Sequence, residues 1–284
     1  YNRAGTRSDK YCYVRLDVDT AWPRLAVVKE PSAAGLHLGP LSSRSTANLV
    51  VEAIQSVVPL RRCSTRLGNR HVPAPGATPC SAAQLGVSQC PCAGQADRSA
   101  YDAAVDVAAR ALRGDPEPIV ARLVARLTEL AAAQRYEEAA LVRDRLAALL
   151  AAVRRQQLTA ALLRSERCTV RRGEVTWVVD HGRLVDVTVT GEVGRALPVD
   201  PPEPPDADRP LRRHHVDEAL CLAKYFDRHA AHLDVMTCTG SWSFPRVDAI
   251  EMPRLDAQVP GPPPVPVGDP AVAASTASTT TAPS

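Results

Sequence analysis

The first apolar segments of the chain have the pattern of two short β-strands. Residues 11–16 and 24–28 are rich in β-branched and aromatic side chains, and the segment between them contains the Asp and Pro residues of a turn. We therefore predict a small β-hairpin. The following residues, from Gly35 to Pro40, contain two glycines and a proline and predict a loop.

The period becomes helical from residue 47 to residue 57. Apolar residues recur there at spacings of three and four, at Leu49, Val50, Ala53, Ile54 and Val57. Ser45 and Thr46 stand just before this segment, where a hydroxyl side chain caps a helix. The pattern predicts one amphipathic helix with a hydroxyl N-cap.

The middle of the chain divides into an irregular part and a helical part. Residues 63–94 are rich in Cys, Pro and Gly and show no period, so they predict a connector that some other constraint must order. Helical spacing resumes at residues 99–114, and two further helices are predicted at 118–133 and 137–164. These last two helices are the most strongly marked elements of the sequence.

After residue 166 the pattern changes to that of short strands. Segments at 169–170, 175–179 and 184–189 surround the turn Asp180-His181-Gly182, which predicts a meander of three strands. A helix at 216–229 and a short strand at 233–238 complete a small α+β, β-rich domain that we place at residues 166–252.

Two segments predict no packed structure. The proline-rich residues 197–210 have the composition of a stiff linker. Residues 253–284 contain mostly Pro, Ala, Ser and Thr and predict a disordered tail. The helices and strands predicted in the rest of the chain give it an α+β fold class.

The composition bears on the class of protein and on its location, but it does not indicate a specific function. The 284 residues carry a formal net charge of +3, so no global basic field demands a nucleic-acid partner. No run approaches the ~20 apolar residues of a membrane span, and no secretory signal precedes the first strand, which predicts a cytoplasmic protein. The chain begins with Tyr1 rather than Met, and we expect it to be a fragment.

The predicted helical hairpin at residues 115–165 has a particular construction. The small residues Ala139 and Ala140 allow close helix packing one turn before Arg143 and Asp144, and Tyr136 stands at the bend. Acidic residues at 137 and 138 favour the start of the second helix through its macrodipole. This construction resembles the UVR motif, the helical hairpin shared by the DNA-repair proteins UvrB and UvrC.

The resemblance implies that the hairpin pairs with its counterpart on UvrB. The residues to which it would give a partner-binding role are Leu127, Tyr136, Glu137, Ala139, Ala140, Arg143, Asp144 and Leu146. The sequence departs from the family at Leu127 and Tyr136, where Met and Phe are usual, and at Gln134, where the polar side chain is expected to weaken the contact. An ordinary Ala-rich antiparallel hairpin is the alternative interpretation of the same segment.

Further short motifs follow one another in the order of UvrC-like proteins over residues 1–165. They are Tyr1-Asn2, residues 8–14, 38–43 and 59–63, then Pro79-Cys80, residues 84–86 and 90–94. The resemblance implies that residues 1–62 are the C-terminal part of a GIY-YIG nuclease domain. Residues 63–114 would be a cysteine-bearing connector that leads to the hairpin.

The catalytic set of such a nuclease is mostly outside this sequence. The resemblance implies that a tyrosine, an arginine and a glutamate that binds Mg²⁺ or Mn²⁺ lie upstream, and only Asn2 matches the family's active-site set. A metal-activated water needs the carboxylate that holds the metal. We therefore expect this chain alone not to cleave DNA, and Asn2 is alternatively an exposed residue near a chain end.

The C-terminal region has a weaker resemblance. Residues 217–221 and 238–243 resemble the end of proteins that fuse a DnaQ-like exonuclease to a UvrC-like half. Asp180, His181 and Asp186 would be the side chains of a free-standing metalloenzyme, but a turn sequence explains the first two without catalysis.

Four cysteines are candidate metal ligands in the connector. Cys63, Cys80, Cys90 and Cys92 lie at or near positions where some UvrC-like proteins hold an iron-sulfur cluster. Thiolates at this density suit either a cluster or structural zinc, and the alternative is four reduced thiols. Arginines 61, 62, 66 and 70, with His71, lie beside them, as a phosphate-binding patch or an ordinary solvated face.

These observations predict a part of a nucleotide-excision-repair nuclease that binds UvrB and DNA, with no membrane association. The alternative function is a non-catalytic adaptor of the same ancestry that binds UvrB or DNA. The genomic sequence upstream of Tyr1 distinguishes the two, because only the nuclease needs the missing catalytic residues.

Overall fold

The computed structural model describes residues 10–65, 67–68, 71–94, 96–191, 195–196, 211 and 213–246. Its first sheet contains the predicted hairpin, formed by β1 (Cys12–Leu16) and β2 (Leu25–Val28), which pair antiparallel. The sheet has three strands in the order β2-β1-β3, and the third strand was not expected. Asn2, the predicted linker at 197–210 and the predicted tail lie outside the described residues.

The prediction of a loop at Gly35 to Pro40 was wrong, because this segment contains the edge strand β3 (Leu36–Leu41). A proline has no N–H for a ladder, and it is tolerated in an edge strand such as β3. Gly39 has a φ of 154°, and a Cβ there would lie 2.7 Å from Cδ1 of Tyr13. The glycine and proline therefore fit the edge of the sheet around a buried tyrosine.

The helix after the first sheet, α1 (Arg44–Gln55), begins earlier than predicted. A hydroxyl caps it, as expected, but the cap is Ser43, whose Oγ accepts a hydrogen bond of 3.1 Å from the backbone N–H of Thr46. Its buried face packs on the sheet and on the long helix described below. The error has a simple source: Arg44 to Thr46 carry no apolar residue, so the helical period is invisible there.

The connector contains two short helical segments, α2 (Ser81–Gln84) and the 3-10 turn η3 (Pro91–Ala93). It leads into α3 (Arg98–Leu112), which Asp97 caps by accepting from the N–H of Ser99. The described residues of the connector outside these pieces are irregular, as predicted from its Cys, Pro and Gly content.

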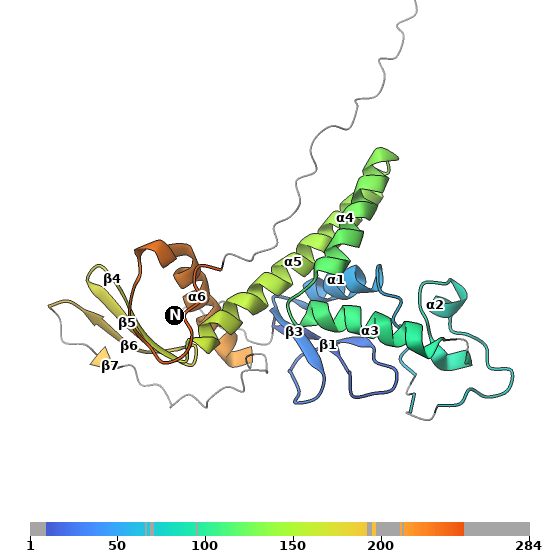
Figure 1. Ribbon diagram of the computed structural model, residues 1–284, viewed down its shortest axis with the longest axis horizontal. Coiled ribbons are helices and arrows are strands. Elements are labelled where there is room, and N and C mark those ends of the chain that lie inside the picture. Colours follow the sequence, from blue (N-terminus) through green and yellow to red (C-terminus); the bar gives the residue numbers. More distant parts are fainter. Residues whose placement is uncertain are drawn as a thin grey trace, which may run out of the picture. The chain divides into compact units, whose positions relative to one another are not determined.

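The two strongest predicted helices form an antiparallel hairpin, α4 (Glu117–Ala132) and α5 (Tyr136–Arg164) (Figure 1). Gln134 makes the turn with a φ of 58°. Although α5 is one helix of 29 residues, its buried residues belong to two hydrophobic cores. Those from Ala139 to Val153 pack with the first sheet, α1, α3 and α4, whereas Leu158, Ala161 and Leu162 pack with the C-terminal sheet and helix.

The C-terminal part is a five-stranded antiparallel sheet with a helix on one face. The predicted meander is confirmed as β4 (Arg167–Arg172), β5 (Val175–Asp180) and β6 (Arg183–Val189). The short strand β7 (Arg195–Ala196) lies beyond β6, and β8 (Asp234–Cys238) pairs with β4 at the other side. Buried residues of α6 (Val216–His229) pack on this sheet.

Several side chains tie the N-terminal sheet and α5 to the C-terminal elements. The hydroxyl of Tyr13 donates to the backbone O of Leu211 at 2.6 Å, and Tyr11 donates to the carboxylate of Asp217. Arg154 on α5 forms an ion pair of 2.5 Å with Asp227 on α6. Among the described residues, no helix is long and apolar enough to cross a membrane.

Candidate functional site

The tip of the helical hairpin exposes apolar side chains. Tyr136, at the start of α5, and Leu141, five residues further on, each keep 57% of their surface exposed. Glu137 is also exposed, and Arg143 and Asp144 form an exposed ion pair of 2.9 Å with each other. Exposed apolar residues that form a contiguous patch often mark a protein-binding surface, whereas single ones are common on any protein.

The other predicted partner-binding residues lie inside the hairpin. Leu127, Ala139 and Leu146 are buried in the first hydrophobic core, and Ala140 is half-buried. The small side chains of Ala139 and Ala140 occur where α5 packs against neighbouring elements, as the motif suggested. These four residues therefore shape the hairpin, and the exposed residues are the ones that a partner can reach.

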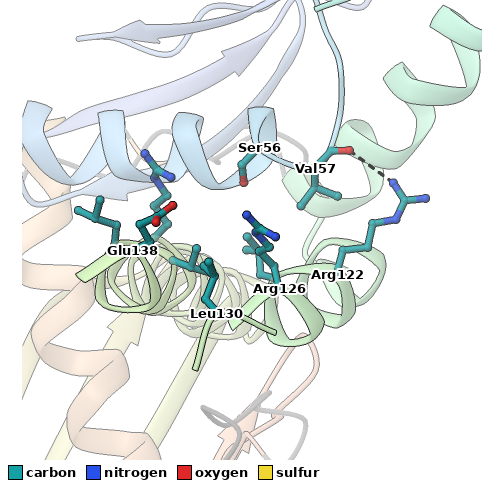
Figure 2. A pocket seen from close by; sticks show the side chains of 10 residues that line it. Ser56, Val57, Arg122, Arg126, Leu130 and Glu138 are labelled. Atoms are coloured by element: carbon teal, nitrogen blue, oxygen red, sulfur yellow. Dashed lines mark hydrogen bonds between the residues drawn. The ribbon is translucent and has the colours of Figure 1, made fainter. Parts of the chain in front are cut away.

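A groove beside the hairpin tip was not predicted from the sequence. Figure 2 shows it between the end of α1 and the two hairpin helices. The groove has a volume of about 400 Å³. Its lining includes Ser56, Val57, Arg122, Leu123, Arg126, Leu130, Glu138, Leu141, Val142 and Arg145. The sequence held one signal: Leu141 is apolar but stands off the stripe formed by Val142, Leu146 and Leu149.

The arginines around this groove are held by the protein itself. Arg122 donates to the backbone O of Val57 at 3.4 Å (Figure 2). Arg145 forms an ion pair of 3.0 Å with Glu52 on α1. Arg126 pairs with Glu129 one turn away at 3.2 Å. Because each cation has a partner, the groove combines fixed positive groups with an apolar floor rather than a strong basic field.

The connector brings its cysteine thiols together. The Sγ atoms of Cys63 and Cys90 are 3.2 Å apart, and those of Cys63, Cys80 and Cys90 all lie within 4.8 Å of one another. Cys92 is adjacent, where its Sγ accepts a hydrogen bond of 3.4 Å from the backbone N–H of Cys80. In the part of the chain that the structure describes, this is the only group of three or more such ligands that can hold a metal ion.

The local environment shifts the pKa values of the Cys90 and Cys92 thiols in opposite directions. Burial raises the pKa of the Cys90 thiol above its usual range, and its hydrogen bond with Cys63 acts in the same direction. Burial also opposes ionisation of Cys92, but hydrogen bonds from the Cys80 backbone and from neighbouring thiols outweigh it, and the pKa of Cys92 is lowered. A metal ion binds thiolates, so it would replace these thiol–thiol contacts with metal–sulfur bonds.

Arg61 does not belong to a phosphate-binding patch. Its side chain is buried, and its guanidinium donates to the backbone O atoms of Trp22 at 2.7 Å and Thr65 at 2.9 Å. It also donates to the backbone O of Cys63 at 3.3 Å and lies 3.7 Å from that residue's Sγ. Arg61 therefore joins the first sheet to the thiol cluster, while Arg66 and Arg70 lie outside the described residues.

The candidate site in the C-terminal sheet is a local cluster of polar contacts around Asp180. Nδ1 of His181 lies 2.6 Å from a carboxylate oxygen of Asp180, whose other oxygen pairs with Arg167 at 3.1 Å. His181 occupies the turn with a φ of 46°. Asp186 contributes no hydrogen bond or ion pair to this cluster, so the described side chains do not assemble the three-residue site of a metalloenzyme.

Two protein-family models match the chain over the regions just described. Residues 11–111 match the middle domain of the UvrC/Cho excinuclease, and residues 119–152 match the UvrB/uvrC motif. The chain belongs to the UvrC-like family. The second match covers most of the α4–α5 hairpin, so the resemblance of this segment to the UVR motif is confirmed. The first match runs across the boundary that we predicted at residue 62.

Several bacterial proteins are similar to the chain. The UvrABC system protein C of Moorella thermoacetica is 29% identical over 163 residues, 57% of this chain and 26% of that protein. That of Geotalea daltonii is 32% identical over 159 residues, 54% of this chain and 24% of its own length. A putative bifunctional exonuclease/endonuclease of Mycobacterium tuberculosis is 33% identical over 207 residues, 70% of this chain and 30% of that protein.

The UvrC-like chain thus spans about a quarter to a third of the length of these relatives. The match to the bifunctional protein covers a larger share of the chain than either match to a UvrC protein. No solved structure is similar to the chain.

Proposed function

We propose that this UvrC-like chain is the partner-binding part of a cytoplasmic DNA-repair nuclease and that its hairpin binds UvrB during nucleotide excision repair. The observation that carries this proposal is the exposed tip of a hairpin that matches the UvrB/uvrC motif. Tyr136 and Leu141 supply apolar contact area, and Arg143 and Asp144 supply charges at the rim. Leu127, Ala139 and Leu146 hold the two helices in the geometry that presents them.

Removing two exposed hairpin side chains tests the partner contact. In the double variant Tyr136→Ala/Arg143→Ala we expect the affinity for UvrB to fall by about tenfold or more, because aromatic and arginine side chains dominate such interfaces. Binding of purified chain to purified UvrB is measured by titration calorimetry.

The matched control is Met236→Ala/Arg110→Ala, which also removes an exposed apolar side chain and an ion-paired arginine but lies outside the hairpin. It should bind UvrB as the unaltered chain does. Equal affinities of the two double variants for UvrB, with unchanged circular dichroism spectra, would show that the hairpin is not part of the interface.

We propose further that the thiol cluster holds a structural metal, either zinc or an iron-sulfur cluster. Cys63, Cys80 and Cys90 would be ligands, with Cys92 the candidate fourth because it contacts Cys80. Such a metal would supply order, because it joins three segments of a connector that has little helix or strand.

Serine substitution tests the metal proposal. We expect the unaltered chain to hold about one metal site per molecule. Cys63→Ser and Cys90→Ser should each lose most of that metal, because serine is a poor ligand for zinc or iron at neutral pH. Elemental analysis of the purified chain identifies the metal, and a visible absorption band distinguishes an iron-sulfur cluster from zinc. Cys221→Ser, on the exposed face of α6, should keep the full metal content, and a metal-free unaltered chain would end the proposal.

In the parent protein, we propose that incision of DNA is performed by a GIY-YIG domain that uses Mg²⁺ or Mn²⁺ and of which Asn2 is one active-site residue. The name of the Mycobacterium tuberculosis relative supports a parent with both exonuclease and endonuclease parts. Genomic sequence before Tyr1 that encodes a tyrosine pair, an arginine and a glutamate would support this proposal. Sequence that lacks them would favour the non-catalytic adaptor.

A further inference from the structure

Two cysteines that the metal proposal does not use face each other in the C-terminal sheet. Cys168 on β4 and Cys238 on β8 are direct partners in the antiparallel register. Both are free thiols. In the described part of the chain, β8 is an edge strand of this sheet and pairs only with β4. Strand β8 can therefore shift slightly relative to β4 without displacing another strand.

The hydrogen-bond pattern tells which kind of cross-strand pair this is. The N–H of Thr239 donates to the O of Arg167 at 2.9 Å, which makes residues 167 and 239 a hydrogen-bonded pair. Pair types alternate along an antiparallel ladder, so Cys168 and Cys238 form a non-hydrogen-bonded pair. Such pairs have Cα atoms about 4.5 Å apart, at the short end of the range that a disulfide spans.

The two side chains lie on the same face of the sheet, because directly opposite residues of an antiparallel ladder point to the same side. The Cys238 thiol donates to the backbone O of Ser165, at the end of α5, at 3.4 Å. A small rotation about the Cα–Cβ bond of Cys238 is the change that would turn its sulfur from Ser165 toward Cys168.

The two thiols differ in access to solvent. Cys168 is completely buried, and burial raises the pKa of its thiol to about 11, with the nearby Cys238 adding to the effect. Cys238 is half-buried on the edge strand. A small oxidant from solvent therefore meets Cys238 first, and Cys168 is placed to complete the reaction.

We propose that Cys168 and Cys238 form a reversible intramolecular disulfide when the protein meets a low-molecular-weight disulfide such as oxidised glutathione. The Cys238 thiolate attacks one glutathione sulfur, forming a mixed disulfide and releasing one glutathione thiolate. The Cys168 thiolate then attacks the Cys238 sulfur and releases the second glutathione. The two cysteines lose two electrons, the oxidant gains them, and the cysteine protons pass to the two glutathione thiolates.

The disulfide would link the end of β8 covalently to β4, the strand that follows α5. After Cys238 the chain returns to α5, where the N–H groups of Gly240 and Ser241 donate to the carbonyls of Ser165 and Arg164 at 3.3 and 2.7 Å. Residues 168 and 238 are distant in sequence, and joining them closes a long loop, which restricts the unfolded chain. Oxidation is therefore expected to stabilise the C-terminal part.

The experiment treats the full chain with oxidised glutathione, blocks the remaining thiols and digests it with trypsin. Cleavage at arginine places Cys168 alone in the peptide 168–171 and Cys238 alone in the peptide 229–246. We expect mass spectrometry to find these two peptides joined, in protein that remains a monomer on a non-reducing gel. The thermal midpoint of the C-terminal part should rise by about 5 °C or more and return with dithiothreitol.

Variants separate the pair from other thiol chemistry. Cys168→Ser should leave glutathione attached to Cys238, and Cys221→Ser, which alters an exposed cysteine of α6, should still give the joined peptides. Glutathione retained on Cys238 of the unaltered chain, or Cys238 joined to a cysteine of the connector, would overturn the proposal.

Discussion

Arg61→Met is expected to lower the free energy of unfolding by about 3 kcal/mol. The guanidinium of this buried arginine donates to the carbonyls of Trp22, Cys63 and Thr65. Methionine keeps the volume but donates nothing, so these acceptors lose their charged donor. A hydrogen bond to a charged group contributes about 1.5–3 kcal/mol, and an acceptor left unsatisfied in a buried place costs about 1–3 kcal/mol.

A second contact enlarges the effect of losing Arg61. Its backbone N–H donates to the hydroxyl of Tyr101 at 3.1 Å, and that hydroxyl donates to the backbone O of Pro23 at 2.5 Å. Burial raises the pKa of Tyr101 to about 12, so the hydroxyl stays protonated and keeps donating at neutral pH. Movement of residue 61 would disturb this chain of bonds between the β1–β2 turn, the connector and α3.

Urea unfolding measures the change if one tryptophan reports on this region. Trp22 packs edge-on against Tyr101, and replacing Trp177 and Trp242 by Phe leaves it as the only tryptophan. Arg62→Met is the matched control, because Arg62 is exposed and donates one bond, to the backbone O of Gln55 at 2.8 Å. It should change stability by less than about 1 kcal/mol. Equal midpoints for the two variants would contradict the structural role assigned to Arg61.

The role of Arg61 illustrates what the sequence could not supply. Residues 61 and 62 are both arginine, and nothing local distinguishes them, yet one is buried under the connector and the other is exposed. The difference depends on where carbonyls of Trp22 and Thr65 converge, which is a property of the tertiary structure. The same limit applies to β3, where Gly39 and Pro40 are turn residues by composition but edge-strand residues in the sheet.

Helices and hairpins with a clear apolar spacing or turn sequence were predicted well. The apolar spacing of α4 and α5 located both helices to within a few residues, and the turn at Asp180 to Gly182 located the β5–β6 hairpin. The tip of the α4–α5 hairpin was predicted only in part. Sequence motifs named both its exposed and its buried residues, but they did not separate Tyr136 from Leu146, because burial depends on packing against α1 and the first sheet.

Gly240→Ala is expected to destabilise the C-terminal part by about 3 kcal/mol. A Cβ at this position would overlap the carbonyl O of Arg164 and would lie 3.0 Å from both Cγ of Glu166 and the carbonyl C of Ser165. The first obstacle is backbone at the end of α5, which cannot rotate away as a side chain can. Overpacking of this kind typically costs about 1–3 kcal/mol, to which lost hydrogen bonds add.

The lost hydrogen bonds are those that complete α5. The last carbonyls of a helix have no partner within it, and here Arg164 and Ser165 accept from the N–H groups of Ser241 and Gly240. Displacing Gly240 to relieve the overlap would break both bonds. It would also shift Trp242, which packs against Phe226 and Phe244 in the second hydrophobic core.

Fluorescence of Trp177 and Trp242 in a Trp22→Phe background follows unfolding of this part. Gly68→Ala is the control, because a Cβ there meets no atom within 4 Å and its backbone does not need glycine. It should leave the urea midpoint unchanged or slightly raised, since alanine restricts the unfolded chain. If Gly240→Ala were as stable as Gly68→Ala, the return of the chain from β8 to the end of α5 would not be the close backbone contact described above, and the disulfide proposed between β4 and β8 would lose the junction it is expected to stabilise.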